Sequence, residues 1–351
     1  MIVLGADTHK RSHTIAAVDA LTGQVVGEKT VPVGVRGGGA LVMWARSLGI
    51  ERVWALEDCR HVSGALERLL IGRGERVVRV STRLMAGARR GGRERGKSDR
   101  IDAIAVARAA LAAGVDSLPT AALAGSELDL RLLVDHRERL VRMRVALNNA
   151  LQWSLHDLWP ELELPGGALF SATWSTKLTR RLARAEQTMR VRIAREELRR
   201  LRELTAAIKS LEGEIAVLVG ELAPQLVAEP GCGPLTAAKL VGEIAGAERF
   251  ASDAKLARAA GIAPIPASSG KTDRHRLDRG GNRQINAAIH RIAVTRARCH
   301  PQTRDYIAQR RAEGKTNRDA IRCLKRHLTR RIWHLLQPPN PRQGDPSPSS
   351  S

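Results

Sequence analysis

The sequence has few aromatic residues, few cysteines and no long apolar run. Aromatic residues make up 3% of its 351 residues, too few for the base-stacking platforms that many RNA-binding domains use. The four cysteines include no C-x-x-C pair, which excludes a zinc ribbon and indicates reduced thiols rather than a disulfide framework. Without a signal peptide or a membrane-length apolar stretch, the sequence predicts a cytoplasmic protein with no membrane partner.

Acidic residues are scarce relative to basic ones. The chain has 36 Asp and Glu against 58 Lys and Arg, a net charge of +22. A preference for Arg codons would not by itself produce this excess. A polyanionic partner is therefore expected, and nucleic acid is the default because each neutralised phosphate releases counterions. With so few aromatic residues, binding to the phosphate backbone fits better than base stacking.

Alternating strand and helix patterns predict an α/β domain with a mixed sheet over residues 1–118. Short apolar runs predict three strands joined by hairpins, followed by helices and strands in alternation. The predicted strands cover residues 2–7, 14–18, 24–31, 52–57 and 75–80, and the predicted helices cover 37–48, 62–71 and 104–113.

Four acidic residues stand at positions where such a domain collects ligands. Asp7 and Glu57 end two predicted strands, and ligands bind at that edge of open α/β sheets. Ser98 is a natural helix N-cap, which places Asp99 and Asp102 on one face of the first helical turn. Taken alone, these acids could be ordinary turn and cap residues favoured by the helix dipole. Together they would repel one another unless neutralised, which predicts a bound divalent cation.

Residues 126–223 have almost no strand pattern. Apolar residues recur at helical spacing over residues 128–151 and again over 189–218, with a break at Pro160–Gly167. This predicts two long amphipathic helices, which form either a coiled-coil hairpin or a plain helical subdomain.

The last domain is predicted over residues 224–336. The turn Gly231-Cys232-Gly233 before an apolar helix is typical of a helix-hairpin-helix element, whose amides bind phosphate without reading sequence. A plain turn between helices that uses glycine is the alternative. The Pro- and Ser-rich end, residues 337–351, is predicted to be disordered.

A loop rich in Ser, Gly and basic residues follows in the same domain. From Ser268 to Arg331 there are 18 basic and 5 acidic residues, the strongest local field for an anion in the chain. Within this loop, Ser268 or Ser269 could meet a phosphodiester as a nucleophile or simply donate a hydrogen bond to phosphate. The basic residues expected to contact nucleic acid are Lys271, Arg274, Arg276, Arg279 and Arg283.

An ordered series of motifs across both ends of the chain resembles the insertion-sequence transposases of the IS-one-ten family, also called DEDD transposases. The D-E-D-D set is matched by Asp7 in Gly-Ala-Asp-Thr-His-Lys, Glu57 in Ala-Leu-Glu-Asp, and Asp99 and Asp102 in Lys-Ser-Asp-Arg-Ile-Asp-Ala. Asp58 is the neighbour of the second position, but Glu57 has the matching residue type. Toward the C-terminus the series continues with Pro-Gly-Cys-Gly-Pro from Pro230, Ala-Gly-Ile-Ala-Pro from Ala260, Ser-Ser-Gly-Lys and Arg-Gly-Gly-Asn-Arg from Arg279.

This resemblance implies a fold and a mechanism. The first domain is expected to be similar to the Holliday-junction resolvase RuvC, with a ribonuclease H-like fold, and its acids Asp7, Glu57, Asp99 and Asp102 to hold Mg²⁺, two ions per site. A C-terminal serine would form a phosphoserine link to DNA. By position this is Ser269, with Ser268 as the alternative because the serine is doubled.

The resemblance also implies partners: target and donor double-stranded DNA, a structured non-coding guide RNA, and further copies of the chain in a dimer or tetramer, in the bacterial cytoplasm near the nucleoid. Two rival functions remain. One is a hydrolytic, junction-resolving nuclease that uses the acidic site alone, and the other is a non-catalytic nucleic-acid-binding protein.

Overall fold

The computed structural model describes residues 1–57, 60–80, 84–85, 98–118, 120, 125–266, 275–276, 278 and 281–337. The chain forms two compact units. One contains Met1–Gly125, Ala228–Gly231 and Glu243–Ser351, and the other contains Ser126–Val227 and Cys232–Gly242. No helix among the described residues is long and apolar enough to cross a membrane.

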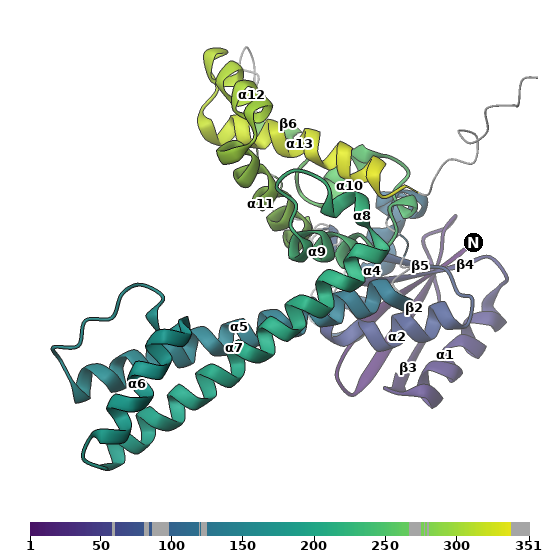
Figure 1. Cartoon of the computed structure of the whole chain (residues 1–351). Helices are drawn as coiled ribbons and strands as arrows, with labels where there is room; N and C mark the ends of the chain where they lie inside the picture. The colour runs from purple at the N-terminus through teal and green to yellow at the C-terminus, as the bar shows by residue number, and fades with distance from the viewer. Residues whose placement is uncertain are drawn as a thin grey trace, which may run out of the picture. The chain divides into compact units, whose positions relative to one another are not determined.

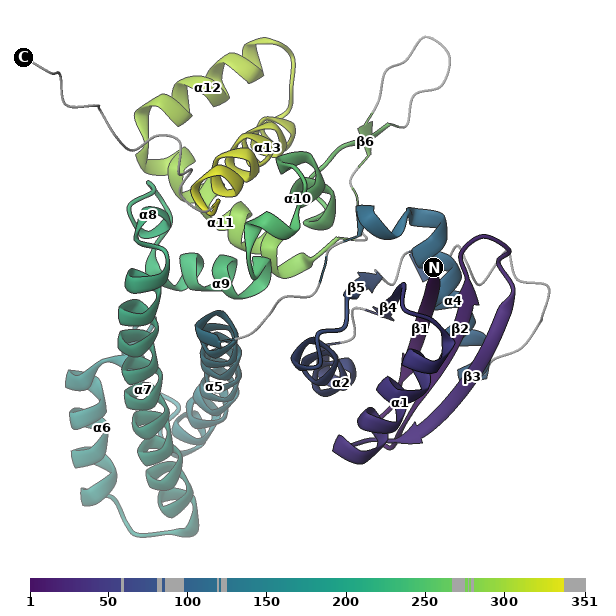
Figure 2. The same cartoon turned by 90° about the vertical axis from the view of Figure 1, so that its right-hand side faces the viewer.

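The N-terminal part is built on a five-stranded mixed sheet (Figure 2). Its strands, in the order β3-β2-β1-β4-β5, are β1 (Ile2–Thr8), β2 (Ser12–Asp19), β3 (Val25–Pro32), β4 (Arg52–Glu57) and β5 (Val77–Val80). The first three pair antiparallel, whereas β4 runs parallel to β1 and β5 parallel to β4. The mixed sheet predicted from the sequence is confirmed.

Helices cover both faces of this sheet because successive strand residues point to opposite sides. On one face Leu4 and Trp54 pack with Leu41 of α1 (Val35–Leu48) and Leu70 of α2 (Arg60–Gly72). On the other face Val3, Val53 and their neighbours pack with the alanine-rich side of α4 (Asp99–Ala113). A short 3₁₀ turn, η1 (Val115–Ser117), follows α4.

Gly5 lets α4 lie directly against the middle of β1. A Cβ at Gly5 would be 2.2 Å from the carbonyl oxygen of Ala103 and 2.5 Å from the nitrogen of Ala107. The start of α4 is also held to β3, since Arg100 Nε donates to Glu28 Oε1 at 2.6 Å. These contacts fix where the first turn of α4 lies relative to β1.

The other unit contains two long helices, α5 (Gly125–Leu158) and α7 (Met189–Leu222), which lie side by side (Figure 1). They run antiparallel, because Arg137 Nε donates to Glu212 at 2.9 Å while Ser154, further along α5, donates to the earlier Glu197 at 2.7 Å. The two predicted helices are confirmed. The structure adds η2 (Ala168–Phe170) and α6 (Ala172–Arg184), which pack on them through a shared apolar cluster. The short α8 (Pro224–Val227) follows α7.

The C-terminal part is almost entirely helical. A turn at Gly231, with φ +77°, precedes α9 (Pro234–Ile244). The elements that follow are η3 (Ala247–Arg249), α10 (Asp253–Ala259), β6 (Ile265–Pro266), β7 (His275–Arg276), α11 (Arg283–Cys299), α12 (Pro301–Ala312) and α13 (Asn317–Leu335). Helices α10, α11 and α12 all pack against α13. Of the predicted tail, residues 338–351 lie outside the described residues.

Candidate active site

Two of the predicted acids end neighbouring parallel strands. The β1–β4 register pairs Ala6 with Leu56 as its last pair, so Asp7 and Glu57 follow at the same edge of the sheet. Ala6 and Leu56 belong to the core beneath α1 and α2. By strand alternation, Asp7 and Glu57 therefore stand on the α4 side of the sheet.

The other two acids arrive on the first turn of α4. Ser98 has an extended backbone conformation, and its hydroxyl accepts a hydrogen bond from the Ile101 amide at 3.2 Å. The predicted N-cap at Ser98 is thus confirmed, and Asp99 and Asp102 are the acidic residues of the first turn. Because α4 packs on β1 at Gly5, this turn lies beside the end of β1.

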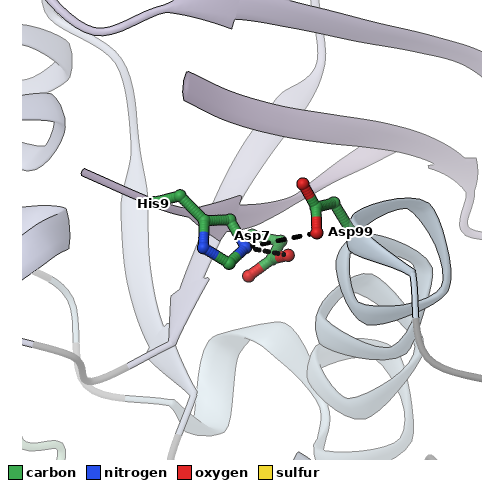
Figure 3. A group of neighbouring side chains, drawn as sticks. All are labelled: Asp7, His9 and Asp99. Atoms are coloured by element: carbon green, nitrogen blue, oxygen red, sulfur yellow. Dashed lines mark hydrogen bonds and ion pairs between the residues drawn. The ribbon is translucent and has the colours of Figure 1, made fainter. Parts of the chain in front are cut away.

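Asp7 and Asp99 come together around a histidine that sequence reasoning missed. His9 Nε2 lies 2.9 Å from Asp7 Oδ2 and 3.4 Å from Asp99 Oδ1 (Figure 3). One ligand atom from each of Asp7, His9 and Asp99 lies within 4.8 Å of the others. The spacing Asp7-x-His9 was the available signal, because residues two apart along an extended chain point to the same side.

The charges in this cluster act on one another. The pKa of Asp7 is raised, chiefly because burial disfavours its charged form; the hydrogen bond from His9 opposes this, and the charges of Asp102 and Asp99 add to it. The pKa of His9 is raised by its hydrogen bond to Asp7 and then by the Asp7 charge, with smaller contributions from Asp99 and Asp102. Asp7, Asp99 and Asp102 are therefore within electrostatic reach of one another.

The donor set fits a divalent cation. Carboxylate oxygens suit hard cations such as Mg²⁺, and an imidazole nitrogen extends the range to transition metals. The Asp7 side chain is 13% exposed, while those of His9 and Asp99 are 51% and 57% exposed. One side of the cluster is thus fixed in the fold and the other faces solvent, where a phosphodiester could approach.

The predicted residues of the C-terminal loop fall into two groups. Arg276 lies in β7 opposite Ile265, and Arg283 is the first residue of α11; both are exposed. Ser268, Ser269, Lys271, Arg274 and Arg279 lie outside the described residues.

Two family models match this chain, one at each end. A transposase model for the DEDD proteins related to IS110 matches residues 4–160, which include all four acids. A second model, described as "Transposase IS116/IS110/IS902 family", matches residues 224–308. The chain belongs to the IS110 family of insertion-sequence transposases. The resemblance stated from the motifs is confirmed.

Proteins of known insertion elements resemble this transposase over most of its length. A 44.8 kDa protein of insertion element IS116 from Streptomyces clavuligerus is 27% identical over 96% of this chain and 94% of its own. A 42 kDa protein of IS900 from Mycobacterium paratuberculosis is 25% identical over 82% of this chain and 84% of its own. A 43.6 kDa protein of IS110 from Streptomyces coelicolor is 35% identical, over 37% of this chain and 33% of its own.

Among solved structures, the transposase is similar to T. thermophilus RuvC in complex with a Holliday junction substrate. The match has 16% identity and a TM-score of 0.28, and it covers 34% of this chain and 99% of that one. The strand order of the sheet and the helices that cover both its faces give the fold class of this part.

Proposed function

We propose that this transposase cuts and rejoins DNA strands through a covalent phosphoserine intermediate, with its acidic cluster holding divalent cations. The observation that carries the proposal is the meeting of Asp7, at the end of β1, with Asp99, at the start of α4, in a member of a DEDD transposase family. The net charge of +22 supports a nucleic-acid substrate.

The metal part of the proposal rests on the donor atoms. Asp7, Glu57, Asp99 and Asp102 would hold Mg²⁺, two ions per site, with His9 between Asp7 and Asp99. Bound cations would neutralise the clustered carboxylates and stabilise the charge that develops on a reacting phosphodiester. The chain's own part is to keep the carboxylates in place, through the Ser98 cap and the contact of α4 with Gly5.

The covalent step is proposed for Ser269, with Ser268 as the alternative. The serine Oγ would form a bond to a DNA phosphorus while the bond from that phosphorus to one deoxyribose oxygen breaks. The hydroxyl proton leaves to solvent or a base, and the released oxygen is protonated. One phosphoester replaces another, so a second DNA hydroxyl could reverse the exchange and rejoin strands without ATP.

The proposed partners follow from the same function. Target and donor DNA would be bound through phosphate contacts by Lys271, Arg274, Arg276, Arg279 and Arg283. A structured non-coding RNA would supply sequence specificity, and assembly as a dimer or tetramer would bring two sets of strand ends together.

The decisive experiment tests for protein-linked DNA. Purified protein is incubated with DNA carrying the element's ends, Mg²⁺ and RNA transcribed from the flank of the element, and the products are denatured. A protein–DNA adduct is expected, and a double variant, Ser268→Ala with Ser269→Ala, should abolish it. Ser210→Ala, an exposed serine of α7, is the matched control. Cleavage at the wild-type rate by the double variant would refute the serine step and indicate a hydrolytic nuclease.

A second experiment separates catalysis from simple binding. Asp102→Asn should abolish strand cleavage while leaving DNA binding largely intact. Asp116→Asn removes a carboxylate that pairs with Arg76 just beyond the same helix, and it should keep full activity. Unchanged activity in Asp102→Asn would indicate that the acids serve only as caps in a non-catalytic binding protein.

A further inference from the structure

We propose that a polar clamp at the base of the loop between α10 and α11 positions that loop for strand transfer. The clamp consists of Glu243, Asn282, Asn286 and Lys325. These residues act through the loop and are positioning residues, not catalytic ones. The inference rests on the proposed function, because the loop contains Ser268 and Ser269.

The two ends of the loop meet in very close backbone contact. Gly261, with φ +64°, leaves α10, and Gly281 leads into α11. A Cβ at Gly281 would be 2.0 Å from the nitrogen and 2.4 Å from the Cα of Gly261. Only glycine permits this approach, so the entry and exit of the loop are fixed against each other.

Asn286 and Lys325 hold the entry side. Asn286 Nδ2 donates to the carbonyl oxygens of Ala260 at 2.9 Å and Gly261 at 3.2 Å. The Asn286 side-chain oxygen accepts from Lys325 Nζ at 2.5 Å. Lys325 belongs to α13 and Asn286 to α11, so this chain of hydrogen bonds ties two helices to the point where the loop begins.

Glu243 and Asn282 hold the exit side. Glu243, 2% exposed at the end of α9, accepts from Asn282 Nδ2 at 2.9 Å. The Asn282 side-chain oxygen caps α11 by accepting from the Gln284 and Ile285 amides, and its own backbone amide donates to the Ala259 carbonyl at 2.6 Å. Asn282, at the end of the loop, is thereby bonded directly to Ala259, the last residue of α10.

Beyond the clamp, the entering and leaving segments of the loop pair as strands β6 and β7. Ile265 of β6 pairs with Arg276 of β7, and Pro266 pairs with His275. In the sequence, Ser268 and Ser269 come two and three residues after Pro266. The clamp thus fixes the chain within a few residues of the proposed nucleophile.

Packing alone does not explain why a lysine occupies the buried position 325. Its side chain is 8% exposed, and among the described residues it forms no ion pair. Burial lowers the pKa of Lys325, as expected for an ammonium group removed from water. Burying an ammonium group is costly unless it is paired or hydrogen-bonded. An ammonium kept at this position is therefore better explained by the hydrogen bond that orients Asn286.

The test compares three variants of the full chain in the adduct assay. Asn286→Ala removes the donor to the loop carbonyls, and Lys325→Met removes the ammonium but keeps its bulk. Trp333→Phe is the control on the same helix, because it loses one hydrogen bond, from Nε1 to the Phe250 carbonyl at 3.1 Å, outside the clamp. The measurements are the rate of serine–DNA adduct formation at saturating DNA, the Kd for DNA, the thermal midpoint, and hydrogen exchange at the Ile262 and Asn282 amides.

Both clamp variants should form the adduct roughly 10- to 100-fold more slowly than wild type, because small misplacements of reacting groups cost factors of this size. Their Kd for DNA should stay within about twofold, since none of the clamp residues is among the basic residues proposed to contact phosphate. Lys325→Met should slow the reaction without lowering the thermal midpoint, which a merely structural role would not do. Exchange at Ile262 and Asn282 should accelerate in Asn286→Ala.

Two results would overturn the inference. One is an adduct rate in Asn286→Ala and Lys325→Met equal to that of Trp333→Phe, and the other is unchanged exchange at Ile262 and Asn282. A wild-type protein that forms no serine-linked DNA would instead refute the proposed function, and with it the positioning role, while the exchange measurement would still report on the clamp itself.

Discussion

Gly5 offers the most direct test of how the acidic site is assembled, because its lack of a side chain leaves room for α4 to pack closely on β1. In Gly5→Ala the new Cβ would be 2.2 Å from the Ala103 carbonyl oxygen, 2.5 Å from the Ala107 nitrogen and 2.8 Å from the Ala107 Cβ. Two of these three atoms belong to the backbone and cannot rotate away. To restore ordinary contact distances, α4 would have to retreat by about 1 Å.

This retreat has two measurable consequences. Overpacking of this kind costs about 1–3 kcal/mol, and each kcal/mol lowers the Tm of a domain this size by roughly 4 °C. The shift also carries Asp99 and Asp102 away from Asp7. Since disturbed support around a metal site weakens binding by about 10- to 100-fold, calorimetric titration with Mg²⁺ or Mn²⁺ should show a loss of this order.

The control is another glycine of the same domain. A Cβ at Gly39, inside α1, has no atom within 4 Å. Gly39→Ala should therefore raise stability by about 0.5–1 kcal/mol, through helix propensity, and leave metal affinity unchanged. A Gly5→Ala protein with wild-type Tm and wild-type metal affinity would refute the idea that close packing of α4 on β1 assembles the acidic site.

Three further predictions concern the same domain. Burial raises the pKa of Glu75, but hydrogen bonds from Arg52, Trp54 and Arg46 outweigh this and hold that pKa below its ordinary value of 4.5. A carboxyl whose folded-state pKa is depressed stabilises the fold above its unfolded-state pKa and loses that effect as the pH falls through the folded-state value. Glu75→Gln should therefore be less stable than wild type at pH 7, and denaturant titrations should show this difference shrinking below about pH 4.5; a constant difference would contradict the assignment. Ser98→Ala should cost about 1 kcal/mol by removing the N-cap of α4, whereas Ser47→Ala, whose hydroxyl donates to the Trp44 carbonyl within α1, should cost less in the same titration. His9→Ala should weaken Mn²⁺ binding more than Mg²⁺ binding, because imidazole favours transition metals; equal losses in calorimetry would show that His9 does not contact the ion.

The sequence predicted the parts of the fold that depend on local pattern. Short apolar runs located all five strands of the sheet, and the Ser98 cap located the start of α4. Helices α6, α10, α12 and α13 were not predicted. In α12, for example, polar and charged residues dominate and two residues, Thr303 and Ile307, are buried, so its apolar face is too narrow to stand out by periodicity.

The candidate site was predictable in its acids but not in its histidine. Asp7 and Glu57 carried a signal because strand ends meet at one edge of a sheet, and Asp99 and Asp102 because a cap fixes their turn. His9 lies one residue beyond the end of β1, and its spacing from Asp7 indicates only that the two side chains point to the same side. Its role depends on the distance between β1 and α4, which the backbone contact at Gly5 sets, and no local rule gives that distance.

His9 helps to explain how the fold tolerates clustered carboxylates. Burial raises the pKa of Asp7, and the charges of Asp102 and Asp99, brought near by the packing of α4 on β1, raise it further, which is an electrostatic cost to the folded state. His9 offsets part of that cost by sitting between Asp7 and Asp99, where its own pKa is raised. The residue that sequence reasoning missed thus pairs with two of the predicted acids and reduces their repulsion. Rules based on local sequence pattern fail at this site because clustered acids that could bind a cation lower the stability of the fold around them.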